Sequence, residues 1–268
     1  MRPPLFQKVI YDYYTRYRRS FPWRETTDPY AILVSELMLQ QTQTYRVLPK
    51  YLNWLQLFPT VKTLANVSLA EVLLAWSGLG YNRRAKYLLE SAKRIVGEYG
   101  GEVPRTYEEL RQLPGIGEYT ANALLAFAYN QPTIVLETNI RTAILHHFFE
   151  NHQEKVSDSQ LKEILANVLD KKNPRDWYYA LMDYGNWLKS EGYDYFHQQK
   201  AHTKQKPFKG SERFVRGYLL REALKTKALK LESINLVGYT QEQIRKIAKN
   251  LVAEGLLQEK KPGILSVV

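Results

Sequence analysis

The chain has 268 residues and a formal net charge of +11, from 38 Lys and Arg against 27 Asp and Glu. This length accommodates one large or two modest domains with a real core. The basic surplus favours a polyanionic partner, because neutralising phosphates drives affinity for nucleic acid. The sequence contains no cysteine, which excludes disulfides, thiolate metal ligands and cysteine nucleophiles.

No apolar run approaches the roughly 18 residues that a membrane helix needs. Met1-Arg2-Pro3-Pro4 is not followed by the long apolar stretch of a signal peptide. We therefore expect a protein without membrane contact that works inside the cell, in the cytoplasm.

Helical periodicity dominates the first two thirds of the chain. A first helix is predicted from Tyr30, directly after Asp28-Pro29. Further apolar stripes with helical spacing cover residues 69–76, 85–99, 121–128, 139–149 and 177–188. No convincing alternating strand occurs before residue 210, so the expected fold class is all-α.

The pattern changes after a Gln/Lys/His-rich stretch at 198–207, which is typical of a linker. Helices are predicted over 213–223, 229–236 and 240–254, with Gly255 as the last stop signal. Two strand-like pieces flank Lys260-Lys261-Pro262-Gly263. We therefore predict a domain at 1–205 and a small winged-helix-like α+β module at 206–268. Arg245, Lys246 and Lys249 on its third helix suit DNA, although a protein partner is equally compatible.

The segment Leu113-Pro114-Gly115-Ile116-Gly117 predicts a tight hairpin between two helices. Backbone N–H groups exposed at the start of the second helix bind phosphate, because that helix end carries a partial positive charge. Ile116 is expected to plug the turn into the core, and Thr120 follows at the helix start. A structural connector without ligand is the alternative; the longer motif favours contact with the DNA backbone.

Around this hairpin, other motifs stand in order over about 170 residues. They are Phe21–Arg24, Pro29–Tyr30, Ser35–Gln43, Phe58–Val61, Leu64–Ala65, Trp76–Tyr81 and Ala180–Gly185. Together they resemble the HhH-GPD (helix-hairpin-helix) DNA glycosylase superfamily, and within it the MutY-type adenine glycosylases. The resemblance implies a two-lobed helical fold with DNA in the cleft between the lobes.

The resemblance also implies chemistry at Glu36, the position of the family's acid. These enzymes extrude a base from the duplex and break its N-glycosidic bond. An acid protonates the leaving base and a carboxylate stabilises the cationic sugar. Glu36 lies among apolar residues, where desolvation raises a carboxyl pKa and keeps the proton available. A surface glutamate, or one buried for a hydrogen bond, is the alternative.

Glu137 stands where the family has an essential Asp, and Asn139 matches an Asn that helps to hold the sugar and this carboxylate. The glutamate is one methylene longer, which shifts its placement by about 1 Å. Three interpretations stay open: Glu137 acts as stabiliser or water activator, the protein is an inactive damage sensor, or another residue does this work.

Tyr119 is a second departure, because bifunctional relatives place a Schiff-base lysine there. We therefore expect a monofunctional glycosylase without a specific lyase step. Tyr119 either contacts the target base or is a packed core residue. Gln41 and Tyr81 match residues that wedge into the helix around the lesion. Gln40 is expected to read the base edge, and Arg24 to contact DNA.

Many relatives hold a [4Fe–4S] cluster with four cysteines after the position of Leu188. This chain has none there, so we expect no iron–sulphur cluster, and Lys189 could preserve basic charge. His146, His147 and His152 form no recognisable ligand motif, and no metal site is expected. The MutT-like domain of MutY proteins is not visible in the sequence.

The predicted function is base excision repair on double-stranded DNA with a mismatch or damaged base, by a chain expected to be a monomer. Adenine opposite guanine or 8-oxoguanine is the favoured target, and T or U opposite G is the alternative. A catalytically silent DNA-binding protein is an alternative of another class. The sequence leaves open the opposite-base preference and the role of the C-terminal module.

Overall fold

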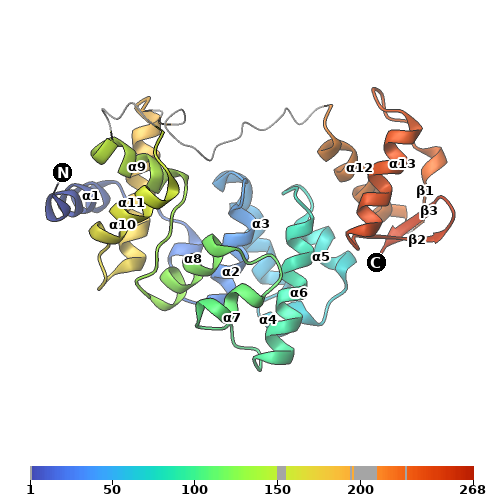
Figure 1. Cartoon of the computed structure of the whole chain (residues 1–268). Coiled ribbons are helices and arrows are strands. Elements are labelled where there is room, and N and C mark those ends of the chain that lie inside the picture. Colours follow the sequence, from blue (N-terminus) through green and yellow to red (C-terminus); the bar gives the residue numbers. More distant parts are fainter. Residues whose placement is uncertain (1, 150–154, 194, 196–209, 227) are drawn as a thin grey trace. The chain divides into compact units, whose positions relative to one another are not determined.

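The computed structural model describes residues 2–149, 155–193, 195, 210–226 and 228–268 (Figure 1). Contacts between residues divide the chain into two compact units. Unit 1 comprises Met1–Glu36, Pro104–Gln112 and Ile116–Lys204, and unit 2 comprises Leu37–Val103, Leu113–Gly115 and Gln205–Val268. The predicted linker at 198–207 lies largely outside the described residues, and the predicted division at residue 205 stays a prediction.

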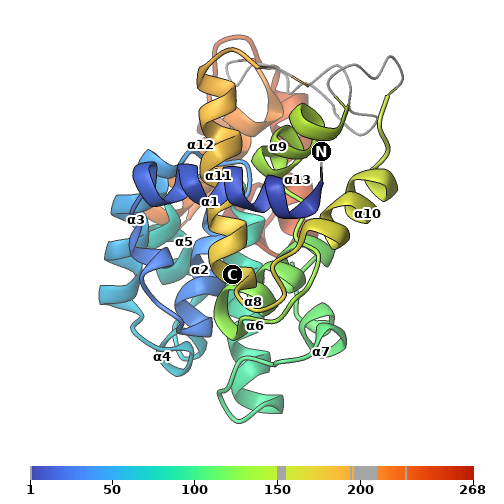
Figure 2. The same cartoon turned by 90° about the vertical axis from the view of Figure 1, so that its left-hand side faces the viewer.

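Unit 1 is a bundle of helices around aromatic side chains. Its helices are α1 (Pro3–Tyr17), the first part of α2 (Pro29–Leu39), α7 (Tyr107–Gln112), α8 (Glu118–Tyr129), α9 (Thr138–Phe149), α10 (Asp158–Val168) and α11 (Pro174–Ser190). The helices α1 and α9 lie against α11 (Figures 1 and 2). Phe6 of α1 meets Trp177 of α11 edge to face at 5.8 Å, and both side chains are fully buried. Burial of such large rings is the main source of stability here.

Unit 2 contains α3 (Thr44–Leu57), α4 (Val61–Ala65), α5 (Leu69–Trp76) and α6 (Arg83–Glu98). The helix α5 begins at a capping box, in which Ser68 and Glu71 each accept from the other's backbone amide. Trp54 of α3 packs against Trp76 of α5 at 5.6 Å. The helix α6 lies against both α4 and α5, and its apolar face closes the core.

The C-terminal module contains α12 (Glu212–Thr226), β1 (Leu229–Lys230), α13 (Gln241–Ala253), β2 (Leu257–Lys261) and β3 (Ile264–Val267). Its three strands form an antiparallel sheet in the order β1-β3-β2. The predicted helix at 229–236 is wrong. Leu229 pairs with Leu265 as a strand, and a short 3-10 turn, η3 (Leu231–Ser233), follows. Leu229 and Leu231 are buried on either side of exposed Lys230, the alternation of a strand.

The expected fold class is confirmed, because the described residues are mostly helical and carry one small sheet at the C-terminal end. The predicted helix at 69–76 is observed with those bounds as α5. No strand precedes β1 in the described part of the chain. Among the same residues, no helix is both long and apolar enough to cross a membrane.

One glycine determines how closely α11 approaches the start of α9. A Cβ added at Gly185 would lie 1.9 Å from the carbonyl oxygen of Asn139. This oxygen belongs to backbone in the first turn of α9, which has little freedom to move. The contact between the two helices therefore requires glycine at position 185.

We predict that Gly185→Ala lowers the free energy of unfolding by about 1–3 kcal/mol, because the added methyl group overlaps the backbone of Asn139. The measurement is denaturant unfolding followed by circular dichroism. The matched control is Gly97→Ala in α6, where an added Cβ meets nothing within 4 Å. That variant should be neutral or up to about 1 kcal/mol more stable, since alanine favours helix. Equal effects of the two substitutions would contradict this account.

Candidate active site

Glu36 lies on a helix that is apolar on all sides. The helix α2 begins after Asp28, whose carboxylate accepts the backbone amides of Tyr30 at 3.1 Å and Ala31 at 3.2 Å. Residues 30–38 are all buried, and Glu36 is 7% exposed. A carboxyl group in this position has lost most of its contact with water. Desolvation disfavours its charged form.

The surroundings of Glu36 make it an acid that holds its proton near neutral pH. Burial raises its pKa to about 7 and outweighs a hydrogen bond from the Tyr119 hydroxyl, which favours the charged form. The charge of Glu137 raises the pKa further, and Arg24 lowers it. The Tyr119 pKa is itself raised, first by burial and then by the charges of both glutamates, so its hydroxyl remains a donor.

Glu137 caps the helix on which Asn139 stands. One oxygen of Glu137, Oε1, accepts the backbone amides of Asn139 at 2.8 Å and Ile140 at 3.0 Å. The other, Oε2, accepts the side-chain amide of Asn139 at 3.3 Å. The longer side chain thus folds back over the first turn of α9, as an N-cap aspartate does with a shorter reach. The Glu137 pKa is raised, because burial outweighs these hydrogen bonds and the nearby charge of Lys189.

Lys189 lies near this carboxylate, a position that the sequence did not predict. It extends from α11, and its Nζ donates to Oδ1 of Asn139 at 2.8 Å. Asn139 therefore accepts from Lys189 and donates to Glu137, which fixes its amide orientation. The signal in the sequence was weak, because Lys189 stands 50 residues from Asn139. The sequence offered it only as a basic residue in the segment after Leu188.

The geometry brings together Glu36, Tyr119, Glu137 and Asn139, the four residues predicted to be catalytic. Two carboxyl groups, that of buried Glu36 and that of half-buried Glu137, influence each other and have different partners. Glu36 is surrounded by apolar side chains and one hydroxyl, whereas Glu137 is held by amides and a nearby ammonium group. Such a pair divides the roles of proton donor and charge stabiliser.

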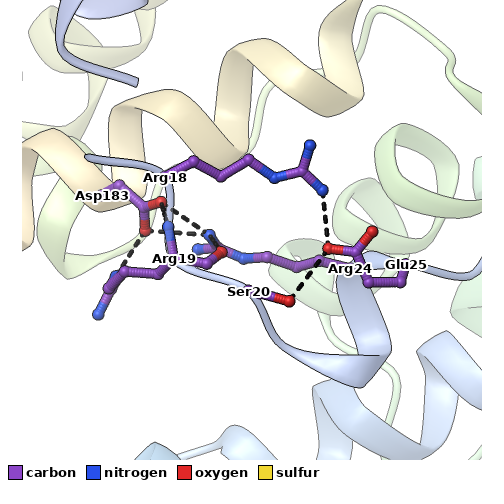
Figure 3. Close-up of polar contacts among 6 residues, drawn as sticks. All are labelled: Arg18, Arg19, Ser20, Arg24, Glu25 and Asp183. Carbon is purple, nitrogen blue, oxygen red and sulfur yellow. Dashed lines mark hydrogen bonds and ion pairs between the residues drawn. The ribbon is translucent and has the colours of Figure 1, made fainter. Parts of the chain in front are cut away.

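The sequence predicted that Arg24 contacts DNA, but its side chain is engaged inside the protein. Its guanidinium is buried and its Nη1 donates to both oxygens of Asp183, at 3.0 and 2.9 Å (Figure 3). Arg19 adds a contact of 2.7 Å from Nε to the same carboxylate. Arg24 also lies over the ring of Tyr179, 4.7 Å from its centroid. A buried, paired arginine stabilises the protein interior and is unavailable to phosphate.

Asp183 was part of a matching motif but had no predicted role. A charged residue within the apolar stripe of 177–188 was the signal that could have identified it. A buried carboxylate requires a cation, and the remote Arg24 supplies it.

The Leu113–Gly117 segment forms the predicted hairpin between α7 and α8. Gly115 has a φ of +76°, and a Cβ there would lie 2.7 Å from Tyr87. The side chains of Leu113, Ile116 and Thr120 are buried, at 2%, 4% and 2% exposure. These three side chains support the hairpin from inside, as expected for Ile116. Contact of this segment with DNA through its backbone stays a prediction. Gly115 and Gly117 are exposed, and their contact with DNA stays a prediction.

Gln41 and Tyr81, the predicted wedge residues, share an uncommon backbone conformation. Their φ angles are +53° and +49°, and Asn130 at a helix end is the only other non-glycine residue of this kind among those described. Positive φ in such residues is strained and is retained where surrounding structure enforces it. Both residues are exposed, Tyr81 to 39%.

Arg84 enforces both turns. Its Nη1 donates to the backbone carbonyls of Leu37 at 2.7 Å, Met38 at 3.0 Å and Gln40 at 2.5 Å, which end α2. Its Nη2 donates to the carbonyl of Gly80 at 3.3 Å, beside Tyr81. Burial lowers the Arg84 pKa to about 10, so the group still carries its charge at neutral pH. One guanidinium therefore fixes the two segments that carry Gln40, Gln41 and Tyr81.

The residues after α11 do not fit an iron–sulphur cluster. A cluster of this kind is held by thiolates, and the chain has no cysteine. His146 Nδ1 lies 2.6 Å from the Tyr195 hydroxyl, and His147 Nε2 lies 2.8 Å from that of Tyr184. Over the described ranges, no three His, Asp or Glu side chains gather as metal ligands. His152 lies outside these ranges.

The raised pKa of Glu36 gives a stability prediction. Between pH 4.5 and about 7 the unfolded chain ionises Glu36 and the folded protein does not. Stability therefore falls as pH rises through this window, by about 3 kcal/mol in total. We predict that Glu36→Gln, which cannot ionise, gains stability relative to the unaltered protein between pH 5 and 8.

Urea unfolding of both proteins at several pH values measures this difference. Glu71→Gln is the control of opposite sign. Hydrogen bonds from Ser68 lower the Glu71 pKa, so this variant should lose stability relative to the unaltered protein as pH rises from 3 to 5. A Glu36→Gln difference that stayed constant with pH would show that Glu36 is ionised in the folded protein.

The family model of the HhH-GPD superfamily base excision DNA repair proteins matches residues 34–169, half of the chain. An adenine DNA glycosylase of Homo sapiens is 36% identical over 191 residues, which cover 67% of this chain and 35% of that protein. One of Mycobacterium tuberculosis is 47% identical over 133 residues, covering 49% and 44%. The chain thus matches less than half the length of each of these relatives.

Solved structures agree on the fold. A thermostable thymine-DNA glycosylase superposes with a TM-score of 0.60 at 27% identity, covering 68% of this chain and 85% of that one. Endonuclease III in a trapped covalent complex with DNA gives 0.59 at 18% identity, which supports the fold alone. This chain belongs to the HhH-GPD superfamily of base excision DNA repair proteins.

Proposed function

We propose that this chain is a DNA glycosylase that removes adenine paired with guanine or 8-oxoguanine from double-stranded DNA. The observation that carries the proposal is the pair Glu36 and Glu137, one a buried acid of pKa about 7 and the other a half-buried carboxylate that caps α9. Similarity to adenine DNA glycosylases over two thirds of the chain supports adenine as the target.

In the proposed reaction, Glu36 donates its proton to a nitrogen of the leaving base. The bond from the base to C1′ of the sugar breaks, and positive charge develops on the sugar ring. Glu137 stabilises this charge, and water completes the hydrolysis at C1′. Tyr119 holds the carboxyl group of Glu36 by its hydroxyl, while Asn139 holds that of Glu137 and is itself held by Lys189.

The test is a panel of labelled duplexes with single mismatches and lesions, incubated with the protein and then treated with alkali. We expect alkali-dependent cleavage at adenine opposite guanine or 8-oxoguanine. Glu36→Gln and Glu137→Gln should each lower the single-turnover rate about 100-fold or more, because each removes a proton donor or a stabilising charge. Binding of lesions without any cleavage would contradict the proposal and would mean that the protein is a DNA-binding protein without glycosylase activity.

Removal of thymine opposite guanine is the second candidate. It is favoured by the structural similarity to a thymine-DNA glycosylase at 27% identity and by Tyr119 in place of a catalytic amine. The same panel separates the two, because cleavage at T opposite G with adenine left intact would replace the adenine proposal.

The pH dependence of base release follows from the role of Glu36. The acid must be protonated, so the single-turnover rate should fall about tenfold for each pH unit above about 7. A rate that keeps rising from pH 7 to 9 would exclude Glu36 as the proton donor. Buffers of constant ionic strength are required, because DNA affinity depends on salt.

We also propose that the reaction stops at the abasic site, since Tyr119 supplies no amine. Borohydride treatment during turnover should give little covalent DNA adduct. Lys189 is the amine that lies beside Asn139, and Lys189→Ala identifies any trapping that does occur. Efficient trapping that disappears in Lys189→Ala would overturn the monofunctional proposal.

A further inference from the structure

The C-terminal module is attached to the start of α6 through one glutamate. Glu254, which follows α13, receives both terminal nitrogens of Arg216 on α12, at 2.9 and 2.5 Å. Arg83, the first residue of α6, contacts the same carboxylate at 2.7 Å. The side chain of Glu254 is 17% exposed. Burial acts to raise its pKa, but hydrogen bonds from Arg216 and Arg83 outweigh this and lower it.

The backbone makes a second attachment at the same place. Lys86 of α6 donates from Nζ to the carbonyl oxygen of Glu254 at 2.6 Å. A Cβ added at the next residue, Gly255, would lie 2.6 Å from that nitrogen, so the end of α13 approaches the lysine closely. Charge-assisted contacts with good geometry at both the side chain and the backbone hold the module against α6.

This attachment brings one arginine of the module to a predicted wedge residue. Arg213, near the start of α12, donates from Nη1 to the hydroxyl of Tyr81 at 3.1 Å. The Tyr81 ring also lies 5.3 Å from the guanidinium carbon of Arg84. Tyr81 is therefore held by its strained backbone, by a cation at its ring and by a donor at its hydroxyl.

We propose that the C-terminal module takes part in lesion recognition: Arg213 positions the Tyr81 side chain for insertion into DNA, and Glu254 keeps Arg213 within reach. The inference rests on the proposed function and on the prediction that Tyr81 inserts into the duplex beside the extruded base. An exposed tyrosine on a turn otherwise loses rotamer freedom when it binds. Fixing the side chain beforehand removes part of that cost and strengthens binding about threefold to tenfold.

The proposal makes Arg213 a positioning residue that acts through one oxygen atom. The Arg213→Met and Tyr81→Phe variants remove the two ends of the same hydrogen bond. Each should weaken binding to a duplex with a stable abasic analogue by about threefold to tenfold. The double variant should bind no more weakly than the weaker single variant, because the bond can be lost only once.

Arg221→Met is the matched control. Arg221 is an exposed arginine of the same helix, with a weak contact of 4.0 Å to Glu222. Both methionine variants remove one positive charge, so they should have similar affinity for an undamaged duplex at a given salt concentration. On the abasic duplex, only Arg213→Met should show the additional loss.

Glu254→Gln tests the attachment without changing Arg213 or Tyr81. It should weaken binding to the abasic duplex, relative to the undamaged duplex, as much as Arg213→Met does. Its thermal unfolding, followed by circular dichroism of the helices, should be unchanged. Arg83→Met removes the α6 side of the contact and should reproduce the loss if Glu254→Gln proves too unstable to measure. All variants are made in the full chain, and fluorescence anisotropy gives the dissociation constants.

Three results would overturn the inference. Additive losses in the double variant would mean that Arg213 and Tyr81 act independently. If Arg213→Met and Arg221→Met lowered affinity for the abasic duplex equally, Arg213 would contribute only its positive charge to binding. Binding to the abasic analogue needs no base release, so these results are distinct from a failed glycosylase assay. A protein that binds abasic and undamaged duplexes equally would also contradict insertion of Tyr81.

Discussion

The chemistry proposed for this protein depends on keeping one carboxyl group away from water. Glu36 stands on a helix whose residues 30–38 are all buried, and burial is the largest influence on its pKa. Arg24 is the positive charge that lowers its pKa, and Asp183 already binds that guanidinium with both oxygens. Because that guanidinium is already paired, burial remains the dominant influence on the Glu36 pKa and raises it to about 7, so the group is mostly protonated below this pH. The stability lost above pH 4.5 is the cost of this arrangement.

The role proposed for the second carboxylate sets the opposite constraint, since a stabiliser of positive charge must itself stay charged. Glu137 accepts hydrogen bonds from backbone amides at the start of α9, and Lys189 places a positive charge nearby. Both favour the charged form of Glu137. The position of that helix start depends on α11, because Gly185 allows its backbone to approach Asn139. Glycine at 185 and lysine at 189 are one helical turn apart on α11, so one helix face sets both the placement and the electrostatics of the carboxylate.

Local patterns predicted most of the elements and pointed to the candidate catalytic residues, but they did not reveal the long-range partners of these residues. The helix at 69–76 and the hairpin at 113–117 follow from capping, glycine and apolar periodicity, all within a few residues. The short strand at Leu229 was read as helix, because only its pairing with Leu265 reveals it. Arg24 was assigned to DNA, because no local pattern reveals an ion pair whose partner lies 159 residues away in the sequence. The Arg213 contact with Tyr81 spans 132 residues and has no local signal.

Without cysteines, the end of α11 is secured by other chemistry. Tyr195 returns to α9 and its hydroxyl meets His146, while Tyr193 packs edge-on against the same imidazole at 4.7 Å. Tyr184 within α11 stacks on His147, whose pKa burial lowers to about 4, so that the ring is neutral near pH 7. The hydroxyl and ring contacts of His146 and His147 join α9 to α11 and to the residues that follow it. The lysine that faces Asn139 is therefore positioned by aromatic packing, which is insensitive to oxidants that attack thiolates.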